Sequence, residues 1–189
     1  MFDDEAIELT RMNCLKYIIS LALLSLLLGF PVPSSAESRD LEILGWVENV
    51  KLLNPEIELK AKLDTGAETS SLDAEVIKKF RQDGKRWIRF QIFDRDTGRE
   101  HVMVRERVRT IGVVQHDGNT QRRPVVTMDV CVAGRVLSVE VSLIDRSEFI
   151  YQLLLGRSAI QSFALVDPAN TFLSNPDCEQ ALAEIEPEP

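Results

Sequence analysis

Apolar and polar residues alternate over much of the chain, and this period of two is typical of half-buried β-strands. Gly, Asn-Pro or Asp-Gly turns separate the alternating stretches, so they are expected to form an antiparallel meander. We predict strands over residues 41–53, 57–63, 86–93, 101–114, 123–132 and 136–144. A mainly β fold follows from this pattern.

Two helices are predicted beside the strands. Ser70 or Ser71 can cap a helix that runs to about Gln82, because acidic residues follow the serines and a glycine lies beyond its end. A second, short helix is predicted over 158–163, after an apolar run that reaches Gly156. From Ser174 onward the chain is acidic and contains proline, and we expect a loose acidic tail over 174–189.

The N-terminal 36 residues have the features of a secretory signal. The stretch 17–32 is almost wholly apolar, with Lys16 before it and the small residues Ser34 and Ala36 after it. We predict cleavage after Ala36, which makes 1–36 the signal peptide, 37–173 the folded domain and the protein periplasmic or secreted. Residues 1–11 are too acidic for the start of a signal, so translation is expected to begin at Met12.

An uncleaved N-terminal anchor is the alternative, and only then would the membrane be a partner. The apolar stretch is shorter than the roughly 20 residues that a membrane span needs. Export makes a disulfide between Cys131 and Cys178 one interpretation of the two cysteines that remain after the signal is removed. The other interpretation is that Cys131 is a free thiol that packs as a small buried hydrophobic residue.

Charge is unevenly distributed along the chain, which has 22 Lys and Arg against 30 Asp and Glu. The stretch 78–123 contains 13 basic and 6 acidic residues, while the remainder of the domain is acidic. A basic middle of this kind favours an anionic partner, although solvated strand faces give the same pattern. Nucleic acid is not expected as a partner.

The tripeptide Asp-Thr-Gly occurs twice. The copy at Asp96 lies between Arg95 and Arg99 and joins two predicted strands, which indicates an ordinary hairpin turn. The copy at Asp64 follows a buried strand directly, and small and hydroxyl residues come after it. A carboxylate held at the end of a buried strand is the arrangement from which aspartic proteases build their catalytic turn.

A second element lies far downstream, where Leu154, Leu155, Gly156 and Arg157 precede the predicted short helix. Together with Asp64-Thr65-Gly66-Ala67, it resembles the retropepsin-like aspartic proteases. The chain is most similar to a bacterial family named for ATP-dependent zinc proteases and since reclassified as retropepsin-like. The resemblance covers about residues 42–168, and its further matching stretches are 44–46, 62–71, 123–126, 143–146 and 166–168.

This resemblance implies a small closed retropepsin-like acid-protease barrel with one or two short helices. Asp64 would be the catalytic carboxylate, Thr65 would lock two such turns together, and Gly66 would permit the turn. Leu155, Gly156 and Arg157 would support the turn from below. Because the mechanism needs two carboxyls and the chain supplies one, a homodimer is implied.

A retropepsin also closes a hairpin, the flap, over its substrate. We expect the flap over 113–122, with Asp117 and Gly118 at its tip; the hairpin at Asp96 is the alternative. Ala67 is expected to contact substrate. Arg122 and Arg123 would grip an acidic substrate, or would simply be solvated at a strand start.

No metal or other cofactor is expected. The two histidines, His101 and His116, are fifteen residues apart in strand and turn contexts, and no phosphate-binding glycine loop is present. The substrate is expected to be a peptide or protein. The association of some family members with a glutamate ligase suggests a glutamate-rich one. The hypothesis is therefore an exported aspartic endopeptidase; the alternative is a non-catalytic periplasmic peptide-binding β-barrel.

Overall fold

The computed structural model describes residues 41–114 and 118–185, apart from the side chains of 184 and 185, and its fold is mainly β. The strands are β1 (Glu42–Gly45), β2 (Val47–Leu52), β3 (Ile57–Asp64), β4 (Ser70–Asp73), β5 (Glu75–Gln82), β6 (Lys85–Phe93), β7 (Glu100–Glu106), β8 (Arg109–Val114), β9 (Thr120–Val132), β10 (Arg135–Ile144), β11 (Leu153–Gly156) and β12 (Ala164–Asp167). Two short helices, α2 (Arg157–Ile160) and α3 (Glu179–Ile185), accompany them.

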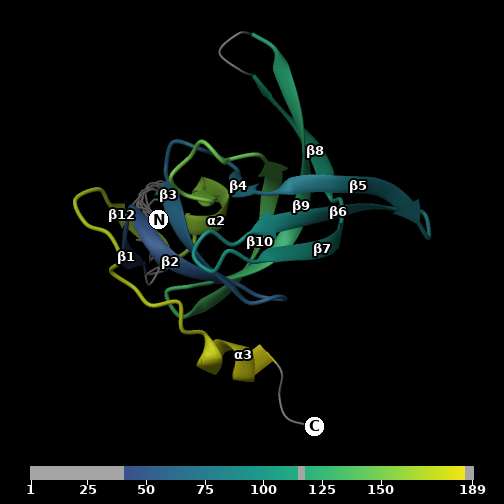
Figure 1. Cartoon of the computed structure of the whole chain (residues 1–189). Coiled ribbons are helices and arrows are strands. Elements are labelled where there is room, and N and C mark those ends of the chain that lie inside the picture. Colours follow the sequence, from purple (N-terminus) through teal and green to yellow (C-terminus); the bar gives the residue numbers. More distant parts are fainter. Residues whose placement is uncertain (1–40, 115–117, 186–189) are drawn as a thin grey trace, which may run out of the picture. The chain divides into compact units, whose positions relative to one another are not determined.

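Six of these strands close into a barrel. Going round the ring, β10 pairs with β4, β4 with β11, β11 with β3, β3 with β2, β2 with β9, and β9 returns to β10. The pairs β10–β4 and β11–β3 are parallel, whereas the other four are antiparallel. The predicted mainly β, closed barrel with short helices is confirmed (Figure 1).

The barrel interior is filled by the apolar members of the alternating strands. In β3 the side chains of Ile57, Leu59, Ala61 and Leu63 are buried, while Glu58 and Lys60 between them are exposed. Leu153 and Leu155 of β11 are fully buried beside them. Burial of this alternating set fixes the register of β3, because a slip by one residue would turn Glu58 and Lys60 inward.

The helix predicted from Ser70 or Ser71 to Gln82 is wrong, since this stretch forms β4 and β5. The two hydroxyls bond to distant segments instead of capping a helix, Ser70 to strand β11 and Ser71 to the loop after β10. Ser70 Oγ accepts a hydrogen bond from Gly156 N at 3.1 Å, and Ser71 Oγ accepts one from Arg146 Nη1 at 2.9 Å. Pairing of β4 with two neighbouring strands thus outweighs the local helix signals.

A separate three-stranded antiparallel sheet has the order β5-β6-β7. Ile88, Phe90 and Ile92 of β6 and Met103 of β7 are buried on one of its faces. Beyond this packed part, β5 and β6 extend away from the barrel (Figure 1). The sheet is therefore anchored to the core along only part of its length.

The strand predicted over 101–114 is two strands that belong to different sheets. β7 pairs with β6, whereas β8 pairs with β9. Arg107 N donates to Arg86 O at 2.6 Å, and the next residue, Val108, donates to Val125 O at 3.0 Å, so the chain changes sheets here. The strand predicted over 41–53 is likewise divided, into β1 and β2, and β1 pairs with β12.

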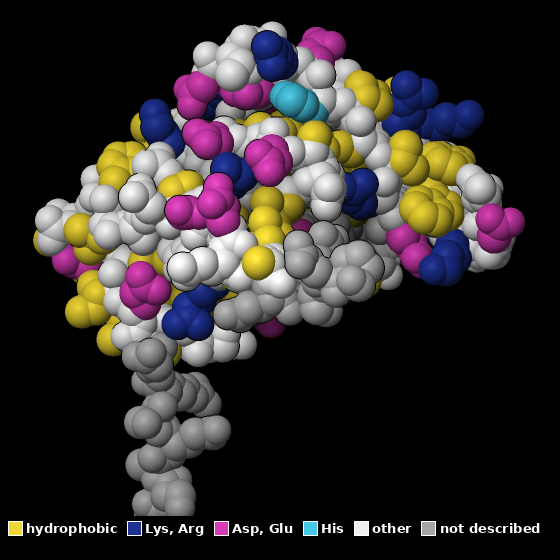
Figure 2. Space-filling view, turned by 90° about the horizontal axis from the view of Figure 1, so that it is seen from below, with side chains coloured by type: hydrophobic (Ala, Val, Ile, Leu, Met, Phe, Trp, Pro, Cys, Tyr) yellow, Lys and Arg dark blue, Asp and Glu magenta, His cyan; other side chains and the backbone are white. Residues whose placement is uncertain are grey.

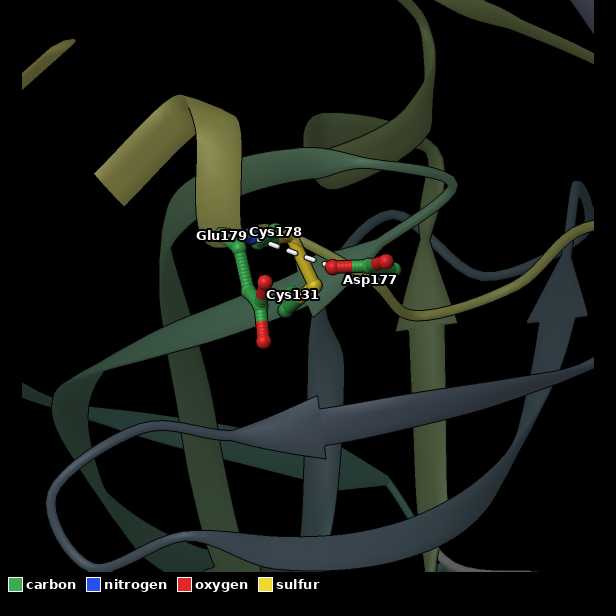
Figure 3. The surroundings of a disulfide bond; sticks show 4 residues. All are labelled: Cys131, Asp177, Cys178 and Glu179. Atoms are coloured by element: carbon green, nitrogen blue, oxygen red, sulfur yellow. Dashed lines mark hydrogen bonds between the residues drawn. A yellow bond between two sulfur atoms is a disulfide. The ribbon is translucent and has the colours of Figure 1, made fainter. Parts of the chain in front are cut away.

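The described part of the predicted acidic tail, residues 174–185, is tied to the domain at two points. The buried carboxylate of Glu48 accepts hydrogen bonds from Leu173 N, Ser174 N and Ser174 Oγ at 3.0–3.1 Å. Cys178 forms a disulfide with Cys131 of β9, and α3 begins at the next residue (Figure 3). The disulfide interpretation of the two cysteines is the correct one. Within the described residues, no helix is both long and apolar enough to cross a membrane.

Candidate active site

Asp64 is the last residue of β3, and the turn that follows it contains Thr65 and Gly66. Strand β3 brings Asp64 to the end of the barrel because Leu63, one residue earlier, is anchored in the core. The side chain of Asp64 is 24% exposed, while Thr65 and Gly66 are exposed and Ala67 is half-buried. The structure thus presents a carboxylate to solvent from a rigid strand end.

The carboxylate of Asp64 is held by its own turn and by one lysine. Asp64 Oδ1 accepts hydrogen bonds from Gly66 N at 2.9 Å and from Ala67 N at 3.3 Å. Lys62 Nζ lies 3.2 Å from Asp64 Oδ2. Burial by itself raises the pKa of Asp64, but the hydrogen bonds from Lys62 and Gly66, the Lys62 charge and the Ala67 N–H outweigh it and lower the pKa. In the single chain Asp64 is therefore ionised at neutral pH.

Gly156 supports this turn from the neighbouring strand. β11 runs parallel to β3, with Leu155 beside Leu63 and Gly156 beside Asp64. A Cβ on Gly156 would lie 2.7 Å from the Thr69 carbonyl carbon and 2.8 Å from Glu68 O. Because these are backbone atoms, only glycine permits this approach.

The residues after Gly156 continue the support. Arg157 N donates to Ala67 O at 2.9 Å, and Ser158 N donates to Glu68 O at 3.1 Å. The guanidinium Nη1 of Arg157 donates to Thr65 O at 2.9 Å and to Gly66 O at 3.1 Å. The structure thus joins Asp64–Ala67 and Leu155–Arg157 into one unit, and the short helix predicted over 158–163 is shorter and earlier, as α2 at Arg157–Ile160.

The second Asp-Thr-Gly copy forms the predicted hairpin turn, between β6 and β7. The preceding residue, Asp94, accepts hydrogen bonds from Asp96 N, Thr97 N and Thr97 Oγ1, at 2.9, 3.1 and 2.5 Å respectively. Asp96 itself is exposed. The two copies thus differ in kind, because Asp94 and not Asp96 holds the loop together.

The hairpin of β8 and β9 lies where the flap is expected, but its tip residues 115–117, including Asp117 and His116, fall outside the described residues. Gly118 and Arg122 are exposed. Arg123 is half-buried, and burial lowers its pKa. In the part of the chain that the structure describes, neither Arg122 nor Arg123 bonds to the turn 64–67, so their role at the site stays a prediction.

Two charged residues of this region carry roles that we did not predict. Lys62 lies two residues before Asp64, and the period of a strand places both on the same side; this signal could have been used. Arg146 is 7% exposed, and its Nε donates to Tyr151 O at 3.2 Å in addition to the bond with Ser71. Its backbone N–H donates to Asp73 Oδ1 at 2.7 Å. No local sequence pattern predicts that Arg146 is buried.

Metal ligands do not gather within the described residues, where no group of three or more His, Cys, Asp or Glu side chains is arranged to hold an ion. His101 is half-buried on β7. The arrangement at Asp64 offers carboxylate chemistry, with a lysine and backbone N–H groups controlling the charge.

A family model described as retropepsin-like aspartic endopeptidase RimB matches residues 43–177. The chain belongs to this RimB-like family. The resemblance drawn from the two sequence elements is thereby confirmed, and the barrel is a retropepsin-like one.

Curated relatives carry a different name. A probable alpha-L-glutamate ligase of Shewanella pealeana is 31% identical over 116 residues, which are 60% of this chain and 25% of that protein. One of Parasynechococcus marenigrum is 36% identical over 112 residues, or 58% of this chain and 24% of that protein. The chain spans about a quarter of the length of these relatives.

A solved structure has a similar fold. It is a Legionella pneumophila protein described as having unknown function, with a TM-score of 0.62 and 36% sequence identity. The match covers 70% of this chain and 98% of that one.

Proposed function

We propose that this RimB-like protein is an exported aspartic endopeptidase that works as a homodimer, with one Asp64 from each protomer. The observation that supports this most strongly is the single carboxylate of Asp64, held at a strand end and supported by Gly156. Asp64 stays accessible while its turn is fixed, as a reacting group must be.

The proposed reaction needs the two Asp64 carboxyls in different protonation states around one water. The ionised carboxyl takes a proton from the water as the water attacks the scissile carbonyl, and the protonated carboxyl gives its proton to the carbonyl oxygen. The C–N bond of the tetrahedral intermediate then breaks: the leaving amine takes the proton that the first carboxyl accepted, and the second carboxyl regains its proton as the carbonyl re-forms. Two like charges brought together cannot both remain ionised, so dimer formation raises one of the coupled pKa values. The lowered pKa of Asp64 in one protomer favours the ionised member of the pair.

Thr65 and Gly66 have supporting roles in this proposal. The side chain of Thr65 is exposed beside Asp64, so its hydroxyl is free to bond to the partner turn across a twofold axis. The Gly66 N–H already donates to Asp64 and orients the carboxylate. Ala67, half-buried after the turn, would border the substrate.

The proposed substrate is an acidic peptide, and one rich in glutamate fits best. The relatives named as glutamate ligases support this, because a protein that resembles part of such an enzyme is expected to meet glutamate-containing peptides. Arg122 and Arg123 on the β8–β9 hairpin would supply cations for it. No cofactor enters this mechanism.

The two Asp-Thr-Gly copies give a matched test. Asp64→Asn removes the carboxylate chemistry while preserving size, and Asp96→Asn makes the same change in an exposed hairpin turn. We expect Asp64→Asn to lose cleavage of a glutamate-rich peptide, and Asp96→Asn to keep it, with circular dichroism showing both folded.

The remaining outcomes contradict the proposal. Activity that survives in Asp64→Asn and is lost on metal chelation would indicate a metallopeptidase. Tight peptide binding without cleavage by the wild-type protein under any condition would indicate the binding module.

A further inference from the structure

A cationic pocket of about 370 Å³ lies toward the far end of the three-stranded sheet. Its lining consists of Lys79, Phe80, Arg81, Arg86, Trp87 and Arg107. This is the end at which β5 and β6 extend away from the barrel (Figure 1). In Figure 2 basic and hydrophobic side chains lie together at the right-hand end of the molecule, with acidic side chains also visible there, on the side toward which these strands extend.

The pocket brings like charges together. Arg81 and Arg86 are cross-strand partners in the β5–β6 register, a position at which like charges are destabilising. Arg107 is joined to them because its backbone N donates to Arg86 O at 2.6 Å. Arg81 and Arg86 are exposed, so solvent screens part of their repulsion, and a bound anion would offset the rest.

The neighbouring Lys85 has a carboxylate partner, whereas the pocket cations have none among the described residues. Lys85 forms an ion pair with Glu106, at 2.8 Å between Nζ and Oε2. Among the described residues, no carboxylate pairs with Lys79, Arg81, Arg86 or Arg107. The pocket therefore keeps four cations available on a protein whose net charge is −8.

An aromatic donor completes the site. Trp87 and Phe80 are cross-strand partners, and both contribute to the lining. The Trp87 Nε1 atom is buried and has no hydrogen-bond acceptor among the described residues. Buried donors are nearly always satisfied, so the orphan N–H of this lining residue is a second feature that a bound acceptor would explain.

The chemistry of the lining selects the ligand. Guanidinium groups match the oxygens of a phosphate in a bidentate fashion, and a phosphate monoester or pyrophosphate concentrates several charges in one compact group. A single carboxylate brings only one charge. We propose that this pocket binds a phosphate-bearing ligand, with the two aromatic rings against its apolar part.

The proposed site is separate from Asp64 and does not depend on the proposed function. From Glu75, which lies near the barrel, β5 runs roughly 20 Å to Arg81 at the rise of an extended strand. Failure of phosphate binding would therefore leave the peptidase proposal untouched, and loss of peptidase activity would leave this one untouched.

Fluorescence of Trp87 provides the readout, because the chain has only two tryptophans. In the full chain with Trp46→Phe, titration with pyrophosphate should change the Trp87 emission to saturation. Arg81→Gln with Arg86→Gln in that background should weaken the affinity at least tenfold. Lys78→Gln with Arg89→Gln is the matched control, since this cross-strand pair removes equal charge from the same sheet outside the pocket. It should change the affinity less than twofold.

Cosedimentation with phosphatidic acid vesicles tests whether the ligand is a lipid phosphate, and phosphatidylcholine vesicles are the control. Binding of either a lipid phosphate or soluble pyrophosphate supports the proposal. Equal loss in the two double variants, or no saturable change with any phosphate, would overturn it. Saturable binding of hexaglutamate without binding of pyrophosphate would also overturn it, in favour of a carboxylate site.

Discussion

Gly156 and Asp64 are directly paired across the parallel strands β11 and β3, although they come from opposite ends of the domain. The pairing leaves no room for a side chain at Gly156, because the backbone of Glu68 and Thr69 occupies that space. The position of the Asp64 carboxylate thus depends on a residue that has no side chain.

Gly156→Ala tests this dependence. The new Cβ would overlap backbone atoms, so we expect a loss of about 1–3 kcal/mol in the free energy of unfolding, and peptidase activity should fall with the displaced turn. Urea denaturation measures the first effect and a peptide assay the second. Unchanged stability together with full activity would show that the turn tolerates displacement.

Lys62→Gln tests the control of the Asp64 charge. The pKa of Asp64 is lowered in the folded protein, so its ionised form adds stability above the unfolded pKa and that stability is lost as the pH falls through the folded pKa. Removing the Lys62 cation should raise the folded pKa toward the ordinary value. The acidic limb of the pH–rate profile should then move to higher pH.

Carboxyl NMR titration of Asp64 is the direct measurement for this variant. Lys60→Gln is the control, because Lys60 lies on the same strand and is exposed, away from the carboxylate. An Asp64 pKa that does not move, or moves down, in Lys62→Gln would contradict the assigned cause.

Arg146→Met tests the buried cation beside the site. The variant keeps an apolar stem but leaves Ser71 Oγ and Tyr151 O without their donors, and we expect a loss of about 2 kcal/mol in stability. Arg99→Met, at an exposed turn position, should change stability by less than about 0.5 kcal/mol. Thermal unfolding measures the loss of stability in each variant. Equal losses in Arg146→Met and Arg99→Met would contradict a special structural role for Arg146.

The disulfide should stabilise the barrel through the segment that it ties down. Cys131 and Cys178 are 47 residues apart in sequence, so replacing both by alanine should reduce the free energy of unfolding by about 2–4 kcal/mol. Urea unfolding with and without reductant measures this. Reductant should lower the stability of the wild-type protein but not of the double variant; a wild-type protein indifferent to reductant would contradict the prediction.

Many of the strands could be predicted because alternation reports burial directly, as in β3 of the barrel and β6 of the three-stranded sheet. The stretch 70–82 could not, because Ser70 and Ser71 have the same local chemistry whether they cap a helix or link strands. Their actual partners, Gly156 and Arg146, are distant in sequence. The division of 101–114 between two sheets was missed for a similar reason, since sheet membership is a tertiary property.

At the site, the sequence predicted the union of Asp64–Ala67 with Leu155–Arg157, because both elements are continuous in sequence and match one family. Lys62 could have been found from strand periodicity alone. Arg146 could not, because its partners are a hydroxyl and a carbonyl brought together only by the closed barrel.

A subunit-mixing experiment tests the central claim most directly. Wild-type protein is exchanged with an equal amount of Asp64→Asn, and the peptidase activity is measured at constant total protein. If catalysis needs one Asp64 from each protomer, activity should fall to about one quarter of the all-wild-type value, because only wild-type pairs remain active. A fall to only about one half, the value for protomers that act independently, would contradict the account.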